Sequence, residues 1–307
     1  MKKLKKILTS KLFQILLSAV LVFVAFRKVD VISLLVEFKH VSWWLILLLL
    51  VYMSVSMFLG GLRWSVLVLK KITFWDVMAF TRATYAGCFY SLFFPSSVGG
   101  DLLKWTSLMK KYPDIPKLRL VGTALIDRII GFSAFSLMAI IALSVGKFLD
   151  FQFPDFLFWL FLGINFALII FYVLVFSLDF EKIFGKYPFF KKLLEIVDLF
   201  KNSNKKKIVI CFLLSLLAEP VWMLLTWFSA MIFKVNISLL QVFIFMPIIS
   251  LILVLPISWA GFGARENLFL IFFGQLGIPA EKLLLVSAFN GIIGILNSLL
   301  GGLLLLF

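Results

Sequence analysis

The sequence predicts an all-α polytopic membrane protein with six full transmembrane helices and two re-entrant or broken helical segments in an inverted repeat. Three observations predict this fold class. Of the 307 residues 63% are hydrophobic, and the mean hydropathy of +1.12 lies outside the range of soluble domains. Several apolar runs reach the roughly 20 residues that cross a bilayer core of about 30 Å. Two motifs rich in Pro and Gly also interrupt apolar segments at matching places in the two halves, as in many transporters.

The chain is predicted to form one transmembrane domain over residues 1–307, with a first repeat at 1–146 and a second at 155–307. The six predicted spans are residues 10–26, 41–62, 120–146, 155–178, 208–233 and 283–307. Two further apolar stretches, about 74–94 and 238–275, contain the Pro/Gly motifs, and we expect them to enter the membrane without crossing it. Each half then holds three spans, an odd number, so the second half is inverted relative to the first.

The distribution of basic residues sets the orientation. The run MKKLKKILTSK precedes the first apolar run but no A-x-A cleavage site follows, so we expect an uncleaved span. With six spans, most of the 30 basic residues lie in the cytoplasm, including the loop from Arg63 to Arg119 and the basic loop 179–207. An alternative with eight spans leaves the lysines of 104–119 outside. We therefore expect a multi-pass protein of the inner (cytoplasmic) membrane with both termini in the cytoplasm.

The basic loop 179–207 contains a pattern that predicts an amphipathic helix from Pro188 to Phe200. Such a helix can lie on the anionic inner leaflet. The alternative is a solvated connector whose lysines only set the orientation of the protein.

The first motif, PSSVGGD, begins with Pro95, which cannot donate a backbone hydrogen bond and so ends the incoming helix. The helix that follows exposes N–H groups and the positive end of its dipole, which suit a phosphate. The alternative is that the acid only caps this helix and the glycines only turn the chain. The predicted headgroup ligands of this motif are Ser96, Ser97, Gly99, Gly100, Asp101 and Lys104.

The second motif, LPISWAGFGARE, repeats this pattern around Pro256. Arg265 is the stronger anion ligand, because a guanidinium group offers a planar fork to a phosphate. The alternative for Arg265 is an internal ion pair with a neighbouring acid. The predicted headgroup ligands here are Ser258, Gly261, Gly263, Arg265 and Glu266.

Asp127 and Arg128 lie within a predicted span, where each charge at mid-bilayer costs about 2.5–3.5 kcal/mol on insertion scales. Since neighbours on a helix point about 100° apart, we expect each to have a different partner. Arg128 is predicted to approach Asp101 or a lipid phosphate. In the second repeat Asn290 and Gly291 occupy the corresponding place, so the charges are not duplicated.

Glu219 is another ionisable residue within a predicted span, and it precedes Pro220, which kinks the helix. Two interpretations are open: a partner for a cationic headgroup or for Arg265, or a proton-coupling carboxylate. Arg82 is either a phosphate ligand or a residue that snorkels to the interface.

Composition argues against several other classes of protein. One histidine, His40, and two distant cysteines, Cys88 and Cys211, predict neither a metal site nor a disulfide framework. The net charge of +15 is carried by loops between apolar runs, so we expect contact with anionic lipid and not with nucleic acid. No cofactor is expected.

The segments PSSVGGDLLKW (95–105), ALIDRIIG (124–131) and LPISWAGFGARENLF (255–269) resemble the lysylphosphatidylglycerol synthase transmembrane-region family, also described as flippase-like integral membrane proteins. In the best understood members a soluble aminoacyl-transferase domain attaches lysine to phosphatidylglycerol, and the membrane region moves the product to the outer leaflet. The chain ends at Phe307 without room for such a domain, so the resemblance implies a stand-alone translocator. The positions implied to line its lipid path are Asp101, Asp127, Arg128, Arg265 and Glu266. Gly291 departs from the family, in which a basic residue is expected there.

Three functions follow. The first is translocation of an anionic phospholipid or a polyprenyl-linked lipid, its headgroup held between the two re-entrant tips. The second is a membrane-embedded lipid-modifying transferase or its subunit, resembling a phosphatidylglycerol lysyltransferase or a glycosyltransferase. The third is an ion or small-solute carrier. Translocation is preferred, because the sequence contains no nucleophile motif and no acidic pair at metal-binding spacing. The sequence leaves the oligomeric state open and allows a separate lipid-modifying enzyme as partner.

Overall fold

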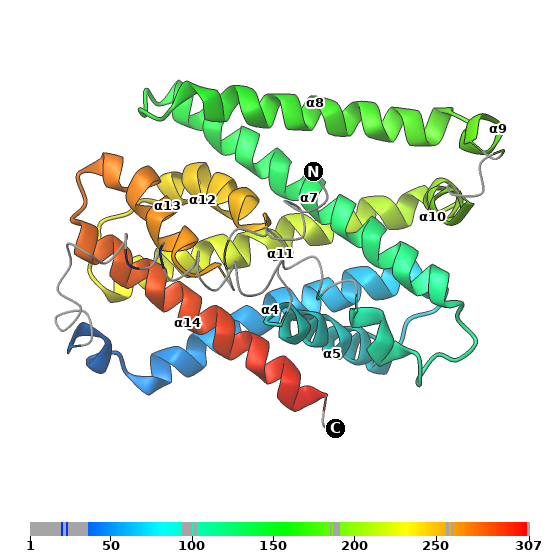
Figure 1. Ribbon diagram of the computed structural model, residues 1–307, viewed down its shortest axis with the longest axis horizontal. Coiled ribbons are helices and arrows are strands. Elements are labelled where there is room, and N and C mark those ends of the chain that lie inside the picture. Colours follow the sequence, from blue (N-terminus) through cyan, green and yellow to red (C-terminus); the bar gives the residue numbers. More distant parts are fainter. Residues whose placement is uncertain are drawn as a thin grey trace. The chain divides into compact units, whose positions relative to one another are not determined.

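The computed structural model describes residues 20, 23, 36–93, 100, 103–184, 186, 191–255, 258 and 261–305. Over these residues the secondary structure is helical and contains no strand, which confirms the predicted all-α class (Figure 1).

Within the described residues, five helices are long and apolar enough to cross a membrane. They are α4 (Trp43–Val68), α7 (Lys117–Phe148), α8 (Asp155–Ser177), α11 (Lys205–Ile232) and α14 (Ala280–Leu304). These helices correspond to five of the six predicted spans. The remaining one, 10–26, lies almost wholly outside the described residues.

The two segments predicted to be broken contain shorter helices. The first holds α5 (Phe74–Ser91), and the 3₁₀ helix η1 (Lys104–Leu108) follows it. The second holds α12 (Leu239–Leu253), α13 (Ala264–Phe272) and the 3₁₀ helix η4 (Gly274–Leu276). The membrane depth of these helices, the number of spans and the inverted repeat stay predictions.

The chain divides into two compact units. Unit 1 comprises Met1–Val55, Tyr85–Leu103 and Pro220–Phe307, and unit 2 comprises Ser56–Thr84 and Lys104–Glu219. Each unit takes segments from both predicted repeats, so the units and the repeats are different divisions of the chain. The two repeats stay a prediction.

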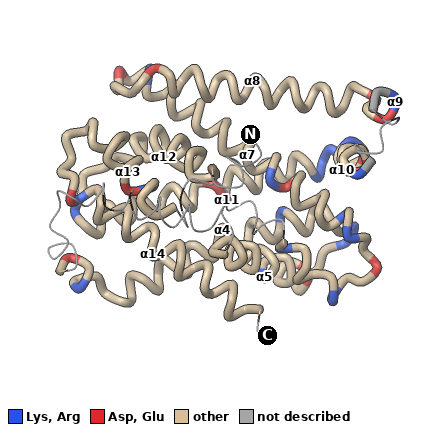
Figure 2. The backbone as a smooth tube through the Cα atoms, in the orientation of Figure 1, with Lys and Arg blue, Asp and Glu red and all other residues tan. Residues whose placement is uncertain are grey.

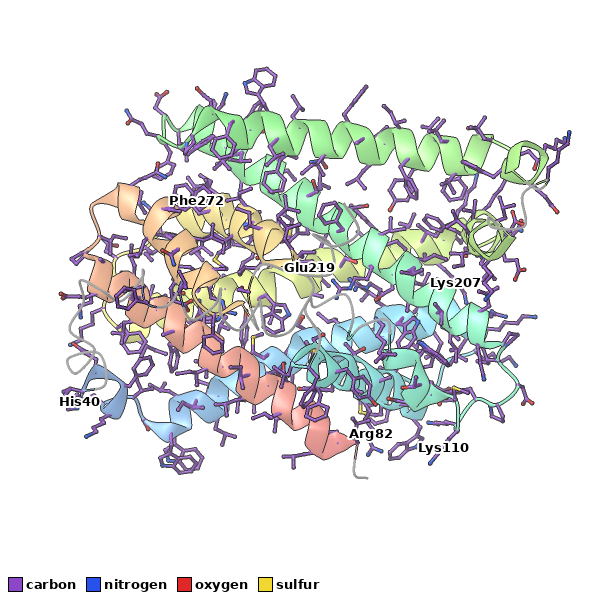
Figure 3. All side chains as sticks on the ribbon, in the orientation of Figure 1. His40, Arg82, Lys110, Lys207, Glu219 and Phe272 are labelled. Carbon is purple, nitrogen blue, oxygen red and sulfur yellow. The ribbon has the colours of Figure 1, made fainter. Side chains whose placement is uncertain are left out.

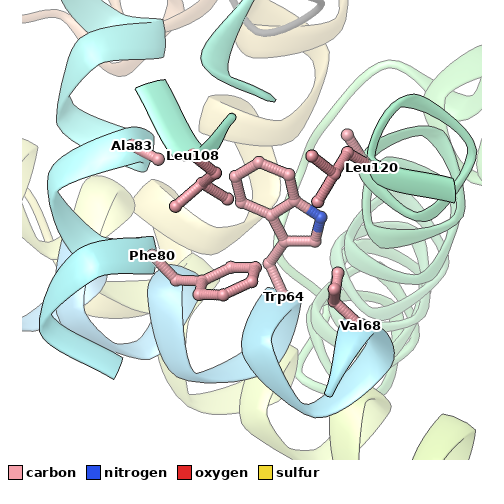
Figure 4. Close-up of a cluster of buried hydrophobic side chains, with 7 residues drawn as sticks. Trp64, Val68, Phe80, Ala83, Leu108 and Leu120 are labelled. Atoms are coloured by element: carbon pink, nitrogen blue, oxygen red, sulfur yellow. The ribbon is translucent and has the colours of Figure 1, made fainter. Parts of the chain in front are cut away.

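A tryptophan organises one core of unit 2 (Figure 4). Trp64 of α4 is fully buried and meets the ring of Phe80 edge-on, with 5.0 Å between the ring centroids. Its indole Nε1 donates to Thr123 Oγ1 of α7 at 3.1 Å, which satisfies the polar atom of a ring buried among apolar groups. The buried cluster consists of Trp64, Val68, Phe80, Ala83, Leu108, Leu120 and Ala124, from α4, α5, η1 and α7.

The end of α4 is stabilised by cations from two other helices. Arg119 Nη2 donates to the carbonyl of Val68 at 2.8 Å, and Lys207 Nζ donates to the carbonyl of Leu69. The last carbonyls of a helix have no partner within it and carry the negative end of the helix dipole, so cations are favourable there.

The predicted amphipathic helix is present as α10 (Lys191–Lys201), which follows the short α9 (Phe180–Phe184). Phe200 is buried against the rings of Tyr172 and Phe176 of α8. Ile196 lies over Gly122 of α7. The apolar face of α10 is therefore packed on the protein, an arrangement that neither sequence-based interpretation of this loop anticipated. Figure 2 shows basic residues gathered on α10 and at the start of α7, whereas α8 has none along its middle.

In unit 1, α14 crosses α5 at very short range. A Cβ atom at Gly301 would overlap the backbone of Tyr85, and one at Gly302 would overlap the ring of Phe89. Small residues allow such close approach of two helices in a membrane. Elsewhere in unit 1, Phe245, Phe269, Phe272 and Phe273 pack α12 against α13 and the turn after it (Phe272 is labelled in Figure 3).

Candidate functional site

An arginine inside α4 is the first member of a buried charged cluster in unit 2. Arg63 was expected in the cytoplasmic loop after a span ending at residue 62, and this expectation is wrong. The helix continues to Val68, and Arg63 is 9% exposed. The segment after Arg63 is nearly as apolar as the span before it, so nothing in it ends the helix.

Asp127 of α7 neutralises Arg63. The Nε and Nη2 groups of Arg63 donate to the two carboxylate oxygens of Asp127, the latter at 3.2 Å. This fork-to-fork geometry is the strong form of an ion pair. Asp127 is 2% exposed, so both charges are removed from solvent.

Lys104 adds a second cation to the same carboxylate. Its Nζ lies 3.2 Å from Asp127 Oδ2 and 4.6 Å from the centroid of the Trp64 ring. The lysine is 3% exposed. Two residues predicted for the site from separate motifs, Lys104 and Asp127, are thus in direct contact.

Glu219 of α11 is the second carboxylate of this cluster (labelled in Figure 3). Its Oε1 lies 3.6 Å from Arg63 Nη1, which also donates to Ser215 Oγ at 2.8 Å. The side chain of Glu219 is 27% exposed, against 3% for Asp127. Pro220 follows it within the helix and has no N–H, so the carbonyl four residues earlier lacks its usual helical partner.

Gly131 of the ALIDRIIG segment lies directly over this pair. A Cβ atom at Gly131 would be 3.1 Å from Arg63 Nη1 and 3.2 Å from Glu219 Oε1. A glycine at this position therefore leaves space beside the guanidinium and carboxylate groups.

Arg128 is half-buried and attracts Glu219 electrostatically. Asp127 and Arg128 thus face different groups, as their spacing on a helix requires. The predicted approach of Arg128 to Asp101 stays a prediction, because Asp101 lies outside the described residues.

The second motif builds a different arrangement in unit 1. Arg265 lies in the first turn of α13, and its guanidinium occupies the space beside two glycines. A Cβ atom at Gly261 would be 2.8 Å from Arg265 Nη2, and one at Gly291 would overlap Arg265 Nη1. Gly291, which lacks the basic side chain expected from the family resemblance, thereby makes room for the cation of another helix.

Glu266 stabilises the start of α13. Its Oε2 accepts from the backbone N–H of Gly263 at 2.6 Å, and its Oε1 accepts from Ser287 Oγ at 3.3 Å. Gly263 has φ of 76°, a conformation that favours glycine. The carboxylate of this predicted ligand therefore caps α13 and links it to α14.

Asn290 joins α14 to α11 within unit 1. It accepts from Ser229 Oγ at 2.6 Å and donates to Thr226 Oγ1 at 2.9 Å. Both partners are fully buried. Where the first half has the charges of Asp127 and Arg128, the second half therefore has a neutral hydrogen-bond network.

The other predicted residues are placed as follows. Gly100 packs against Gly87 and Ser91 of α5, Ser258 is buried, and Arg82 is exposed on α5 (Figure 3). Ser96, Ser97, Gly99 and Asp101 lie outside the described residues. Among the residues described, no three His, Cys, Asp or Glu side chains are grouped for a metal ion.

Asp76, at the start of α5, has a shifted pKa. A hydrogen bond from the Tyr112 hydroxyl, followed by those from Thr73, holds the pKa of Asp76 below its usual value. These contacts fasten the start of α5 to the chain that follows η1.

Sequence reasoning missed Arg63 and Ser215. A signal for Arg63 existed: a buried acid within one span requires a cation of comparable depth, and Arg63 continues an apolar run that does not end until Leu69. Nothing in the local sequence distinguishes Ser215 from the other hydroxyls of α11.

Comparison with known proteins gives one family. The family model described as "Lysylphosphatidylglycerol synthase TM region" matches residues 11–301. A search of curated proteins and a search of solved structures each found no match.

Proposed function

Because the chain belongs to the lysylphosphatidylglycerol synthase TM region family, we propose that it translocates the headgroup of a membrane lipid between the leaflets. Membership indicates a lipid-related function in the membrane. The substrate class we propose is a phospholipid or another lipid whose headgroup carries an anionic phosphate, such as a polyprenyl-linked lipid.

The observation that carries the proposal is the buried cluster of Arg63, Lys104, Asp127 and Glu219. Three of these side chains come from helices long enough to span a membrane. Charges at such positions are costly, and apolar residues of similar size are often as stabilising as a buried ion pair. A cluster of four is therefore better explained by a ligand than by stability.

The chemistry of the cluster suits a phosphate. Arg63 presents a planar fork and Lys104 a compact ammonium, and Asp127 already occupies both as an internal anion. A headgroup phosphate carries a similar set of oxygens and would accept hydrogen bonds from the same kinds of cation. The acyl chains would stay in the bilayer, along apolar surfaces such as the exposed side chains of α8.

Arg265 is the proposed headgroup ligand of unit 1. Its guanidinium packs against Gly261 and Gly291, whose lack of side chains makes room for it. We propose Glu266 and Asn290 as residues that position this end of the lipid path through their hydrogen bonds. The residues of the first motif keep the role proposed for them from the sequence.

The test is headgroup accessibility in vesicles reconstituted with the purified full chain. Wild-type protein should speed leaflet exchange of at least one anionic phospholipid or polyprenyl lipid. Lys104→Met should slow this exchange at least about tenfold, since one lost charge-assisted bond in such a site costs over 1.4 kcal/mol. Lys147→Met is the control, because Lys147 forms an exposed ion pair with Asp155 at 3.2 Å.

If wild-type protein speeds the exchange of none of the candidate lipids, translocation is wrong. A chemically modified lipid that appears with wild-type protein and disappears with Asp127→Asn, while lipid binding is kept, would support the transferase alternative.

A further inference from the structure

The two carboxylates of the unit 2 cluster differ in how firmly they are held. Asp127 receives two hydrogen bonds from Arg63 and one from Lys104, and its side chain is 3% exposed. Glu219 lies 3.6 Å from Arg63 Nη1, beyond hydrogen-bond length, and its side chain is 27% exposed. Glu219 is therefore the carboxylate that can exchange its partner at lower cost.

The groups facing Glu219 come from two helices. Arg63 of α4 and Arg128 of α7 attract its carboxylate, and Asp127 of α7 repels it. Lys104 of η1 belongs to the same cluster through Asp127. Gly131 of α7 lies beside Arg63 and Glu219, at a place where a Cβ atom would crowd both side chains.

The charges of the cluster balance as they stand. Among the groups joined by ion pairs, Arg63 and Lys104 carry two positive charges, and Asp127 and Glu219 carry two negative charges. Arg128, which also attracts Glu219, is only half-buried, so its charge is not counted in this buried set. An anion that joined this set would leave the cluster with a buried net charge, which is strongly unfavourable. If Glu219 takes up a proton at the same time, the balance is restored, because one negative group replaces another.

We propose that Arg63 is an anion-binding group and that Glu219 is its exchangeable counter-ion, released by protonation when a lipid phosphate binds. The proton comes from the aqueous solution, adds to the Glu219 carboxylate, and leaves Arg63 Nη1 to donate to a phosphate oxygen. This inference rests on the proposed function, since the anion is taken to be the headgroup phosphate. It goes beyond that function by giving Glu219 the role of counter-ion, and it couples anion binding to one proton.

The sign of the pH dependence follows from this exchange. The bound state carries one more proton than the free state, so affinity rises as the pH falls. One coupled proton gives at most about a tenfold change in affinity per pH unit. Glutamine at position 219 resembles the protonated side chain, so Glu219→Gln should bind the anion tightly and without this pH dependence.

The experiment titrates short-chain phosphatidylglycerol into the purified full chain in an uncharged detergent, at pH values from about 5 to about 8. Its phosphodiester keeps one charge over this range, so changes in affinity come from the protein. Wild-type affinity should rise at least about tenfold from the upper to the lower end of this range. Glu219→Gln should match the tight wild-type limit throughout, and Arg63→Gln should weaken binding at all pH values.

Glu37→Gln is the matched control. Glu37 also lies beside a cation at a comparable distance, Lys282 at 3.5 Å, but its side chain is 49% exposed on the surface. This variant should keep the wild-type pH dependence. Proton uptake on adding the lipid to lightly buffered wild-type protein is a second measurement, which decides the matter if Glu219→Gln does not fold.

The outcomes separate this inference from the function on which it rests. Equal wild-type affinity at both ends of the pH range, with no proton uptake, overturns the proton-coupled site even if lipid exchange is observed. Glu219→Gln with the wild-type pH dependence also overturns it. Binding with proton uptake but without leaflet exchange would support the anion site and contradict translocation.

Discussion

Buried charge is the feature that distinguishes individual residues of this chain. In the unit 2 cluster each of the two acids lies close to a cation, and the best-paired acid, Asp127, contacts both Arg63 and Lys104. The corresponding position of the second half, Asn290, is satisfied by hydroxyl groups without any charge. The two copies of the sequence motif therefore satisfy their buried polar groups differently, one with ion pairs and the other with neutral hydrogen bonds.

Asp127→Asn should lower the free energy of unfolding by about 3 kcal/mol, because removing one member of a buried ion pair leaves the other charge without compensation. Thermal unfolding of the purified variant in detergent measures this loss. Asp155→Asn removes an acid whose side chain is 80% exposed and should unfold with the wild-type protein. Equal unfolding temperatures for Asp127→Asn and wild type would contradict the assigned pairing.

Gly131→Ala should reduce lipid exchange several-fold, because the added methyl group presses on Arg63 and Glu219 at 3.1–3.2 Å. Gly294 closes the equivalent AFNGIIG segment, and a Cβ atom there has nothing within 4 Å. Gly294→Ala should therefore be tolerated. Exchange rates of the two variants in one vesicle preparation make the comparison, and equal rates would show that the Gly131 contact is unimportant.

At the scale of elements, the crossing of α4 and α5 depends on one glycine of a Gly-Gly pair. Gly61 of α4 lies against the backbone of Thr81 of α5, so that a Cβ atom would come within 2.6 Å of the backbone nitrogen and Cα. At the adjacent Gly60 a Cβ atom would make an ordinary contact with Thr84 Cγ2 at 3.5 Å. One position of this Gly-Gly pair therefore decides how α4 and α5 pack.

Gly61→Ala should destabilise the protein by at least about 2 kcal/mol, since overpacking against backbone forces a helix to move. Gly60→Ala should be neutral or slightly stabilising, because alanine favours a helix by up to about 1 kcal/mol over glycine. Unfolding in detergent compares the two variants. A loss of similar size for both would show that α4 does not cross α5 in this register.

The packing of α10 makes a second prediction at this scale. Phe200→Ala should cost about 3 kcal/mol, the usual loss for truncating a buried phenylalanine, because Phe200 is 2% exposed. Leu193→Ala on the same helix should change stability little, as Leu193 is 53% exposed. If instead Leu193→Ala alone reduces binding to anionic vesicles and Phe200→Ala leaves stability unchanged, α10 lies on the lipid and not on α7 and α8.

At the scale of the whole molecule, the side of the membrane that each loop faces decides between six and eight spans. The six-span arrangement puts both the loop around Lys110 and the basic helix α10 in the cytoplasm, whereas eight spans put both outside. Exposed aromatic residues mark the ends of α4: Trp43 and Trp44 stack at its start, and Phe74 and Trp75 follow its end. Such residues favour the interface between lipid and water, which supports α4 as a full span.

Single cysteines at Lys110 and Lys192, in a chain without Cys88 and Cys211, test this arrangement. Both should react with a membrane-impermeant thiol reagent only from the cytoplasmic side. A cysteine at Phe148, which is 87% exposed at the end of α7, should react only from the opposite side. Reaction of the positions at Lys110 and Lys192 from the outer side, and of the position at Phe148 from the cytoplasm, would favour eight spans.

The helical class, the approximate positions of five long helices and the interruption of the last third of the chain could all be predicted from the sequence. These features depend on local properties, namely runs of apolar residues and the positions of Pro and Gly, which act within a few residues. The sequence also identified Lys104, Asp127, Glu219 and Arg265 as candidate site residues, because an ionisable residue near or within an apolar run is conspicuous by itself.

Only the tertiary structure decided which of these charges meet. Arg63 and Glu219 lie more than 150 positions apart, and no local pattern relates an arginine at the apparent end of one span to a glutamate in another. The packing of α4, α7 and α11 brings them together, and the glycine at position 131 leaves them room. The sequence by itself determined which charged residues are energetically costly in the membrane, because that cost depends on the local apolar run. The pairing that offsets the cost depends on how the helices pack, which is a long-range property.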